Sequence, residues 1–228
     1  MEKDGWRFVG PLALLFLAAL WLLARMGFQG WAWAPALVLG LLTAFCANFF
    51  RDPDRPLPAD QDLLVSPADG RVLEVKDIRD PWVGRAREIR VFLNLFNVHV
   101  QRNPFTGEAR VGRVDYHPGK FMAASAPKAS LENEQNWVCL EGKGGRRVRV
   151  KQIAGLIARR IVCRVKPGDL LAGGQRLGLI RFGSQVDLVV PASARVLVKA
   201  GDPVTGGLSP LARLAPARSA RTRTGRRP

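Results

Sequence analysis

Two apolar runs near the N-terminus constrain the fold of this chain more than any other feature of its sequence. Residues 8–24 and 31–50 are almost wholly apolar, and the segment between them carries a single charge, Arg25. The second run is long enough to cross a bilayer as a helix, and the first is at the short end of that range. The sequence therefore predicts a membrane-anchoring helical hairpin over residues 1–50, which either crosses the bilayer twice or re-enters it.

A signal peptide and a pair of buried helices are the alternatives to a membrane hairpin. A secretory signal peptide would account for Lys3 and Arg7 ahead of the first run. However, no small-residue cleavage site follows that run, and the second run would then have no role. Helices buried in a soluble core would also be apolar. Tryptophans at the ends of the runs favour the membrane hairpin, because indole rings suit the interface between lipid and water.

The charge distribution predicts an orientation for the hairpin. The chain has 35 Lys and Arg against 19 Asp and Glu, a formal net charge of +16. Lys3 and Arg7 precede the first run, and Arg51 and Arg55 follow the second. Because positive residues gather on the cytoplasmic side, we expect a cell-membrane protein with both ends of the hairpin in the cytoplasm. The three cysteines have no CxxC spacing, so neither a disulfide framework nor a metal site is expected.

Composition divides the rest of the chain into three parts. Residues 51–62 are rich in Pro and Asp, which is typical of a linker. Over residues 63–209, short β-branched runs alternate with Gly, Pro and Asp turns and predict a mainly β domain. Residues 210–228 carry six arginines among small polar residues and are predicted to be a disordered tail. Beside a membrane hairpin, such a basic tail favours anionic lipid headgroups over nucleic acid.

An internal repeat refines the predicted fold. Residues 165–174 and 198–207 share the pattern V-K-x-G-D-x-x-x-G-G. This pattern resembles the hammerhead turns of the barrel-sandwich hybrid in biotinyl and lipoyl domains. Those carriers present a modifiable lysine at a hairpin tip, and no such tip is evident here. The repeat therefore predicts a barrel-sandwich-hybrid-like β domain without a carrier function.

Three further stretches hold candidate functional residues. Asp69 lies in the turn Ser66-Pro67-Ala68-Asp69-Gly70, and His99 lies in the strand-like run 88–102. Gly183 and Ser184 interrupt two strand-like runs between residues 178 and 191. Each has an ordinary structural role available by itself, namely a hairpin turn, a core histidine and a β-bulge. His117, the other histidine, lies in what the sequence predicts to be a surface turn.

Taken together and in this order, these stretches resemble the phosphatidylserine decarboxylase proenzymes, in their short, archaeal-type, membrane-anchored form. The resemblance extends from about residue 8 to residue 210. It implies self-cleavage between Gly183 and Ser184 into fragments 1–183 and 184–228, which stay together as a heterodimer. It also implies a covalent pyruvoyl group derived from Ser184 as the cofactor, with His99 as the base and Asp69 orienting it.

The implied reaction converts phosphatidylserine into phosphatidylethanolamine and carbon dioxide through a Schiff base to the pyruvoyl group, as a step of phospholipid biosynthesis. His99 is the candidate proton donor in that reaction, no metal is implied, and a homodimer stays open. Two positions depart from the family pattern. Phe96 stands where longer bacterial relatives have a second histidine, and Gln185 stands where their Leu-Gly-Ser-Thr motif has threonine.

Two alternative functions are kept open. A non-catalytic membrane adaptor built on a biotinyl- or lipoyl-like β domain would stay a single intact chain without a reactive carbonyl. A pyruvoyl decarboxylase of a soluble amino acid would share the self-cleavage, but it would have no reason to carry a membrane hairpin.

Overall fold

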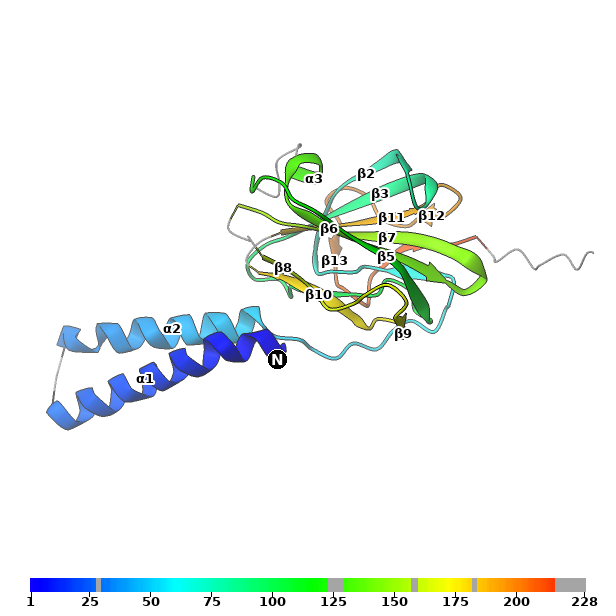
Figure 1. Ribbon diagram of the computed structural model, residues 1–228. Helices are drawn as coiled ribbons and strands as arrows, with labels where there is room; N and C mark the ends of the chain where they lie inside the picture. The colour runs from blue at the N-terminus through cyan, green and yellow to red at the C-terminus, as the bar shows by residue number, and fades with distance from the viewer. Residues whose placement is uncertain (28–29, 123–128, 157–159, 182–183, 216–228) are drawn as a thin grey trace, which may run out of the picture.

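The computed structural model describes residues 1–27, 30–122, 129–156, 160–181 and 184–215, and it joins a helical pair to a β domain (Figure 1). Helix α1 (Trp6–Met26) follows the short 3-10 helix η1 (Lys3–Gly5), and helix α2 (Ala34–Phe49) follows η2 (Gly30–Trp33). By length and composition, both helices could cross a membrane. The predicted N-terminal apolar helical pair is therefore confirmed.

The β domain consists of short strands joined by turns, with one short helix, α3 (Ala129–Glu132), and one 3-10 turn, η3 (Lys143–Gly145). The strands are β1 (Leu63–Val65), β2 (Gly70–Asp80), β3 (Gly84–Leu93), β4 (Val100–Arg102), β5 (Ala109–His117), β6 (Gln135–Gly142), β7 (Arg146–Ile153), β8 (Arg160–Cys163), β9 (Leu170–Leu171), β10 (Arg176–Arg181), β11 (Ser184–Pro191), β12 (Arg195–Val196), β13 (Pro203–Val204) and β14 (Pro210–Arg213). The mainly β class predicted from the sequence is confirmed.

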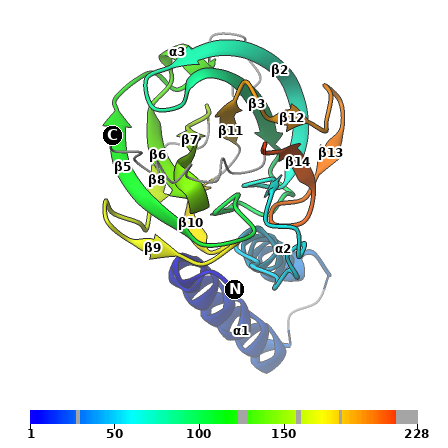
Figure 2. The ribbon, with the colours of Figure 1, turned by 90° about the vertical axis from the view of Figure 1, so that its right-hand side faces the viewer.

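One large sheet curls around the hydrophobic core. Its strand order is β13-β2-β3-β11-β7-β6-β5-β9, and two three-stranded sheets, β1-β14-β12 and β4-β10-β8, complete the wall (Figure 2). Alternate residues of β11 show how the core is filled, because Val186, Leu188 and Val190 all belong to the buried apolar cluster. The intervening residues of this strand therefore face the other side of the sheet.

The two copies of the sequence repeat fold into equivalent turns. Asp169 and Asp202 each accept a hydrogen bond at 2.9 Å from a backbone N–H, that of Lys166 and Lys199 respectively. The glycine of each turn has φ of +94°, a left-handed conformation that only glycine adopts without strain. The first turn bonds to the backbone of Val111 in β5, and the second bonds to that of Val72 in β2. The repeat thus marks two matching corners of the domain.

The helical pair is fastened to the domain at the end where α1 begins and α2 ends. Phe49 and Phe50 pack with Leu179 of β10, and Phe8 stacks on Phe50 with ring centroids 5.4 Å apart. Asp4 also pairs with Arg164 and Arg181, which flank β8 and end β10. Both apolar and ionic contacts therefore make the base of the hairpin a part of the folded domain.

Two predicted boundaries differ from the structure. The predicted strand 88–102 is broken into β3 and β4 by a turn, in which Asn94 and Asn97 bond to each other through backbone and side chain. Asparagine side chains favour such turns over a continuous strand. At the C-terminal end, β14 pairs with β1 and β12 beyond the predicted boundary at residue 209, and its Leu211 is buried. The disordered tail stays a prediction for residues 216–228, which lie outside the described residues.

Candidate active site

The strand register brings two of the predicted site residues, Asp69 and Ser184, to the same edge of the large sheet. This edge is formed by the ends of the strands and not by an outermost strand. Strands β2, β3 and β11 are neighbours, and one row across them contains Arg71, Phe92 and Gln185. Asp69 lies two residues before Arg71, and Ser184 lies directly before Gln185. Because the strands are antiparallel, this edge is also where β3 ends and the turn toward His99 begins.

His99 lies on the crossover from β3 to β4, directly before Val100. Val100 pairs with Leu179 of β10, and β10 is the strand that leads toward β11. Two crossovers therefore run between the same pair of sheets, one carrying His99 and the other ending at Ser184. Phe182 and Gly183, the residues predicted to precede the scissile bond, lie outside the described residues.

Asp69 is held in place by three donors. Arg55 pairs with both carboxylate oxygens, through Nη1 on Oδ1 and through Nη2 at 2.9 Å from Oδ2. The backbone N–H of Gly206 donates to Oδ1 at 2.8 Å. The next residue must be glycine, because a Cβ at Gly70 would collide with the carbonyl oxygen of Phe92. The turn therefore fixes the position of the Asp69 carboxylate at the start of β2.

His99 is almost wholly buried, with 1% of its surface exposed. Its ring lies against the ring of Phe49, with centroids 4.2 Å apart, and its Nδ1 is 2.9 Å from the carbonyl oxygen of Asn97. A carbonyl oxygen can only accept, so Nδ1 carries the proton of the neutral ring. The lone pair then belongs to Nε2, the atom that could take a proton from a nucleophile.

Burial lowers the pKa of His99 to about 4. The positive charge of Arg51 acts in the same direction, whereas the Asn97 carbonyl and the negative charge of Asp69 raise the pKa. The influence of Asp69 indicates that the two predicted residues are electrostatic neighbours. At neutral pH the imidazole is therefore uncharged, as a general base must be.

Ser184 begins β11 and is fully buried, opposite Leu93 of β3. Its Oγ has no hydrogen-bond partner within the described part of the chain. A buried hydroxyl without a partner is costly for folding, so such groups often mark chemistry rather than architecture. The serine predicted as the precursor of the pyruvoyl group thus has its hydroxyl uncommitted.

The sequence did not single out three residues that shape this site. Arg55 lies in the predicted linker and orients Asp69, Phe49 ends the predicted anchor and covers His99, and Arg51 donates to the carbonyl oxygen of Phe96 at 2.7 Å. All three act on residues far along the chain, and no local pattern in the sequence carries that information. For Arg55, the available signal was its positive charge in the otherwise Pro- and Asp-rich segment 51–62.

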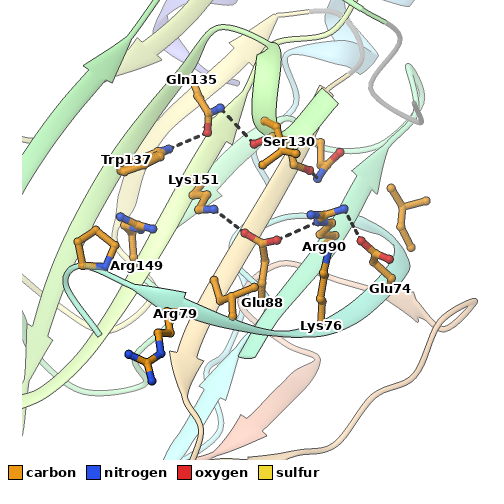
Figure 3. A pocket seen from close by; sticks show the side chains of 15 residues that line it. Glu74, Lys76, Arg79, Glu88, Arg90, Ser130, Gln135, Trp137, Arg149 and Lys151 are labelled. Carbon is orange, nitrogen blue, oxygen red and sulfur yellow. Dashed lines mark hydrogen bonds and ion pairs between the residues drawn. The ribbon is translucent and has the colours of Figure 1, made fainter. Parts of the chain in front are cut away.

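A charged pocket of about 780 Å³ lies on the other face of the large sheet (Figure 3). Glu88 is at its centre and pairs with Lys151 and with Arg90, whose Nε is 2.9 Å away. Arg149 lies over the ring of Trp137, 3.9 Å from its centroid. These charged side chains are buried, and Glu88 joins Arg90 to Lys151 in an ionic layer on this face of the sheet.

Gln185 connects this ionic layer to the end of β11 that begins with Ser184. Its Nε2 donates to Asp187 Oδ1 at 2.6 Å and to Ser130 Oγ at 2.5 Å. Burial and the neighbouring Glu88 raise the pKa of Asp187 to about 7. The glutamine that departs from the family motif therefore tethers the start of β11 to α3.

Comparison with known proteins places this architecture in a family. The family model described as phosphatidylserine decarboxylase matches residues 42–212. The chain is 47% identical over 215 residues to a phosphatidylserine decarboxylase proenzyme of Ralstonia nicotianae, covering 94% of this chain and 95% of that protein. It is 46% identical over 205 residues to the proenzyme of Nitrosomonas eutropha, covering 90% of each.

A third relative, the phosphatidylserine decarboxylase proenzyme of Burkholderia lata, is 43% identical over 215 residues, which are 94% of this chain and 96% of that protein. These matches span the helical pair as well as the β domain. The chain is a member of the phosphatidylserine decarboxylase family.

Proposed function

We propose that the chain is a phosphatidylserine decarboxylase proenzyme that cuts itself between Gly183 and Ser184 and then converts phosphatidylserine into phosphatidylethanolamine and carbon dioxide. The observation that carries the proposal is the uncommitted, buried Ser184 hydroxyl at the edge where Asp69 and the His99 crossover lie. Membership of the family supplies the class of reaction.

Self-cleavage follows from the chemistry of these residues. His99 Nε2 accepts the Ser184 hydroxyl proton as Oγ attacks the carbonyl carbon of Gly183. The C–N bond breaks, its nitrogen takes the proton, and an ester joins residues 183 and 184. Loss of the ester oxygen from Cβ, with the Cα proton removed, leaves a carboxylate on Gly183 and dehydroalanine at position 184. Water then replaces the nitrogen of that residue with a ketone oxygen, which releases ammonia.

The residues of the site fit the resulting group. A pyruvoyl group at position 184 supplies a ketone and an adjacent carbonyl, which together form an electron sink for the loss of carbon dioxide. The chain itself contributes the enclosure of β3 and β11 around position 184, and the neutral imidazole of His99 to move a proton. Asp69, held by Arg55 and Gly206, stabilises positive charge on that imidazole while it holds the proton.

The helical pair is an argument for a substrate that lies in a bilayer. Both ends of the pair join the β domain, so the hairpin and the site belong to one folded unit. Lys3, Arg7 and Arg51 lie at these ends, and Arg25 is at the far one. We therefore infer a cell-membrane protein whose catalytic domain, residues 63–209 with the strand after it, lies on the cytoplasmic side.

Intact-mass analysis of the full chain beside a Ser184→Ala variant tests the proposal. We expect the unmodified protein to give two fragments, 1–183 and 184–228, with a keto group in place of the amine at residue 184. The variant should stay a single chain. Release of carbon dioxide from phosphatidylserine vesicles, with free serine as the comparison substrate, then identifies the substrate.

Each alternative function has its own outcome in these experiments. A single intact chain in both samples would contradict the proposal and favour a non-catalytic membrane adaptor. Cleavage together with activity on free serine alone would favour a decarboxylase of a soluble amino acid.

A further inference from the structure

Exposed apolar side chains gather at the edge of the β domain that carries the candidate active site. Within the described part of the β domain, the large hydrophobic residues that are exposed number six: Phe96, Tyr116, Leu131, Leu156, Leu170 and Leu197. Phe96 is 69% exposed, Leu131 is 76% exposed and Leu156 is 57% exposed. A soluble surface leaves few such side chains together, so their grouping points to a partner.

The strand register shows that these three residues leave the sheet at the same edge. Phe96 lies three residues after Leu93, the β3 residue that pairs with Ser184. Leu156 lies three residues after Ile153, the β7 residue that pairs with Gln185. The β3–β4 and β7–β8 connections therefore carry one apolar side chain each, three residues beyond the paired position.

Leu131 reaches this edge from α3, which directly precedes β6. The Glu134 carbonyl oxygen accepts a hydrogen bond from Ala154 N at 2.9 Å, and the Asn133 side chain donates to the Ala154 carbonyl at 2.8 Å. These bonds hold the segment containing Leu131 beside the segment containing Leu156. Tyr116, near the end of β5, lies at the same edge through its pairing with Asn136.

The helical pair leaves the domain beside Phe96. Arg51, two residues after the end of α2, donates to the carbonyl oxygen of Phe96 at 2.7 Å. Figure 1 shows α1 and α2 extending to the left from the lower part of the domain, with α3 at the upper left of the domain. A bilayer that contains both apolar helices must end close to Arg51, and Phe96 is bonded to that residue.

We propose that Phe96, Leu131 and Leu156 form a lipid-contacting rim, which seats the edge of the β domain in the bilayer surface around the reaction centre. The inference rests on the proposed function, because it explains how a lipid headgroup reaches position 184 while its acyl chains stay in the membrane. The helices anchor the protein, and the rim sets the depth and tilt of the catalytic domain. Apolar side chains at this depth are stabilised by the area they remove from water.

Lipid quenching of a labelled side chain tests the rim without an activity measurement. Phe96→Cys, Leu131→Cys and Leu156→Cys are made in a Cys163→Ser background, because the other native thiols, Cys46 and Cys139, are buried. Each is labelled with bimane and reconstituted as full chain into phosphatidylcholine and phosphatidylglycerol vesicles that contain a nitroxide lipid. Leu170→Cys is the matched control, because Leu170 is 62% exposed and lies at the other edge of the sheet, where β5 begins. We expect quenching at the three rim positions and none at position 170.

A second measurement separates seating on the bilayer from folding. The double variant Leu131→Gln and Leu156→Gln is compared with Leu170→Gln on phosphatidylserine in vesicles and on a short-chain phosphatidylserine dissolved as monomers. We expect kcat/KM on vesicles to fall about tenfold in the double variant, the effect of losing part of the burial of two leucines. Self-cleavage and the activity on monomers should change by less than about twofold, since neither needs the bilayer.

The outcomes are distinct for the rim and for the proposed function. Equal quenching at positions 131, 156 and 170 would overturn the rim. So would an equal loss of activity on vesicles and monomers, or no loss on either. Absence of decarboxylation in the unsubstituted protein would overturn the proposed function instead, and the quenching pattern would still decide whether the rim exists.

Discussion

At the scale of single residues, the site depends on a histidine that its surroundings keep uncharged. The ring of Phe49 lies against His99, and burial lowers the pKa of this histidine to about 4. Between pH 6.5 and 4 the unfolded chain binds a proton that the folded chain does not. The stability contributed by the buried neutral ring is therefore complete above pH 6.5 and is lost as the pH falls through this window.

The role of Phe49 can be tested through the pH dependence of self-cleavage. In the unsubstituted chain, the rate should fall only as the pH drops toward about 4, where His99 gains its proton. Phe49→Ala admits water beside the imidazole, which moves the pKa of His99 up toward its ordinary value of about 6.5. The decline should then begin near pH 6, measured as the fraction of freshly made precursor cut at each pH. Leu41→Ala removes an exposed apolar side chain from the same helix and should leave the profile unchanged, whereas an unchanged profile in Phe49→Ala would refute this role.

A second residue-scale prediction concerns Arg55. Its two hydrogen bonds orient the Asp69 carboxylate, and a truncated side chain leaves that carboxylate partly buried without its counter-ion. Arg55→Ala should slow self-cleavage by about tenfold or more, the usual effect of losing an orienting charge in a catalytic arrangement. Gel analysis of precursor and product over time measures this rate. Arg146→Ala is the control, because Arg146 pairs with Asp62 of the same linker but lies away from Asp69. An equal slowing in both variants would mean that the linker matters rather than Asp69.

At the scale of elements, the two repeated turns hold β5 and β2 in equivalent ways. Each uses an aspartate side chain on a backbone N–H and a glycine at φ of +94°. Because the hydrogen bond and the glycine conformation match, we expect the two turns to contribute similarly to stability. We therefore expect both copies of the repeat to contribute to the stability of the domain as well as to its shape.

This equivalence gives a paired prediction. Asp169→Ala and Asp202→Ala should each destabilise the domain by about 1 kcal/mol, the typical contribution of one such hydrogen bond. The double variant should lose the sum, because the turns bond to different strands and distant sites add. Thermal unfolding in detergent, on a Ser184→Ala background that stays uncut, provides the measurement. A loss confined to one of the two positions would show that the likeness of the turns is only geometric.

At the scale of the whole molecule, the sequence predicted the elements better than their contacts. The apolar runs and the V-K-x-G-D repeat are local patterns, and they predicted the helical pair and the β class. The order of residues could not show that Phe49 covers His99, because that contact depends on how the hairpin docks. It also could not show β14, whose residues belong to a basic, Pro-containing stretch but pair with β1 at the start of the β domain.

The same holds for the site. The resemblance to the family pointed to Asp69, His99, Gly183 and Ser184, and the structure puts Asp69 and Ser184 at the edge where the His99 crossover begins. Arg55 and the tether of Gln185 to Ser130 required coordinates, since each joins residues more than ten positions apart. The roles of these residues stay predictions until the variants are made.

The position of β11 has a consequence for the cut protein. This strand lies between β3 and β7, and β14 lies between β1 and β12. A chain cut before Ser184 is therefore a two-polypeptide sheet, in which the shorter partner supplies two interior strands. Refolding of the cut protein requires an encounter of two molecules, so its rate should rise with protein concentration, whereas that of uncut Ser184→Ala should not. Denaturant dilution in detergent at several concentrations measures both. A rate independent of concentration in the cut protein would contradict this expectation.

The proposed self-cleavage would be a one-way step for the folded chain. In the single chain, β11 is covalently joined to the strands that precede it, and a cut before Ser184 would end that covalent link. Separated fragments would recover this topology only by first meeting in solution. The stability of the cut protein would then be kinetic. It would depend on the rate at which the interior strand β11 separates from β3 and β7.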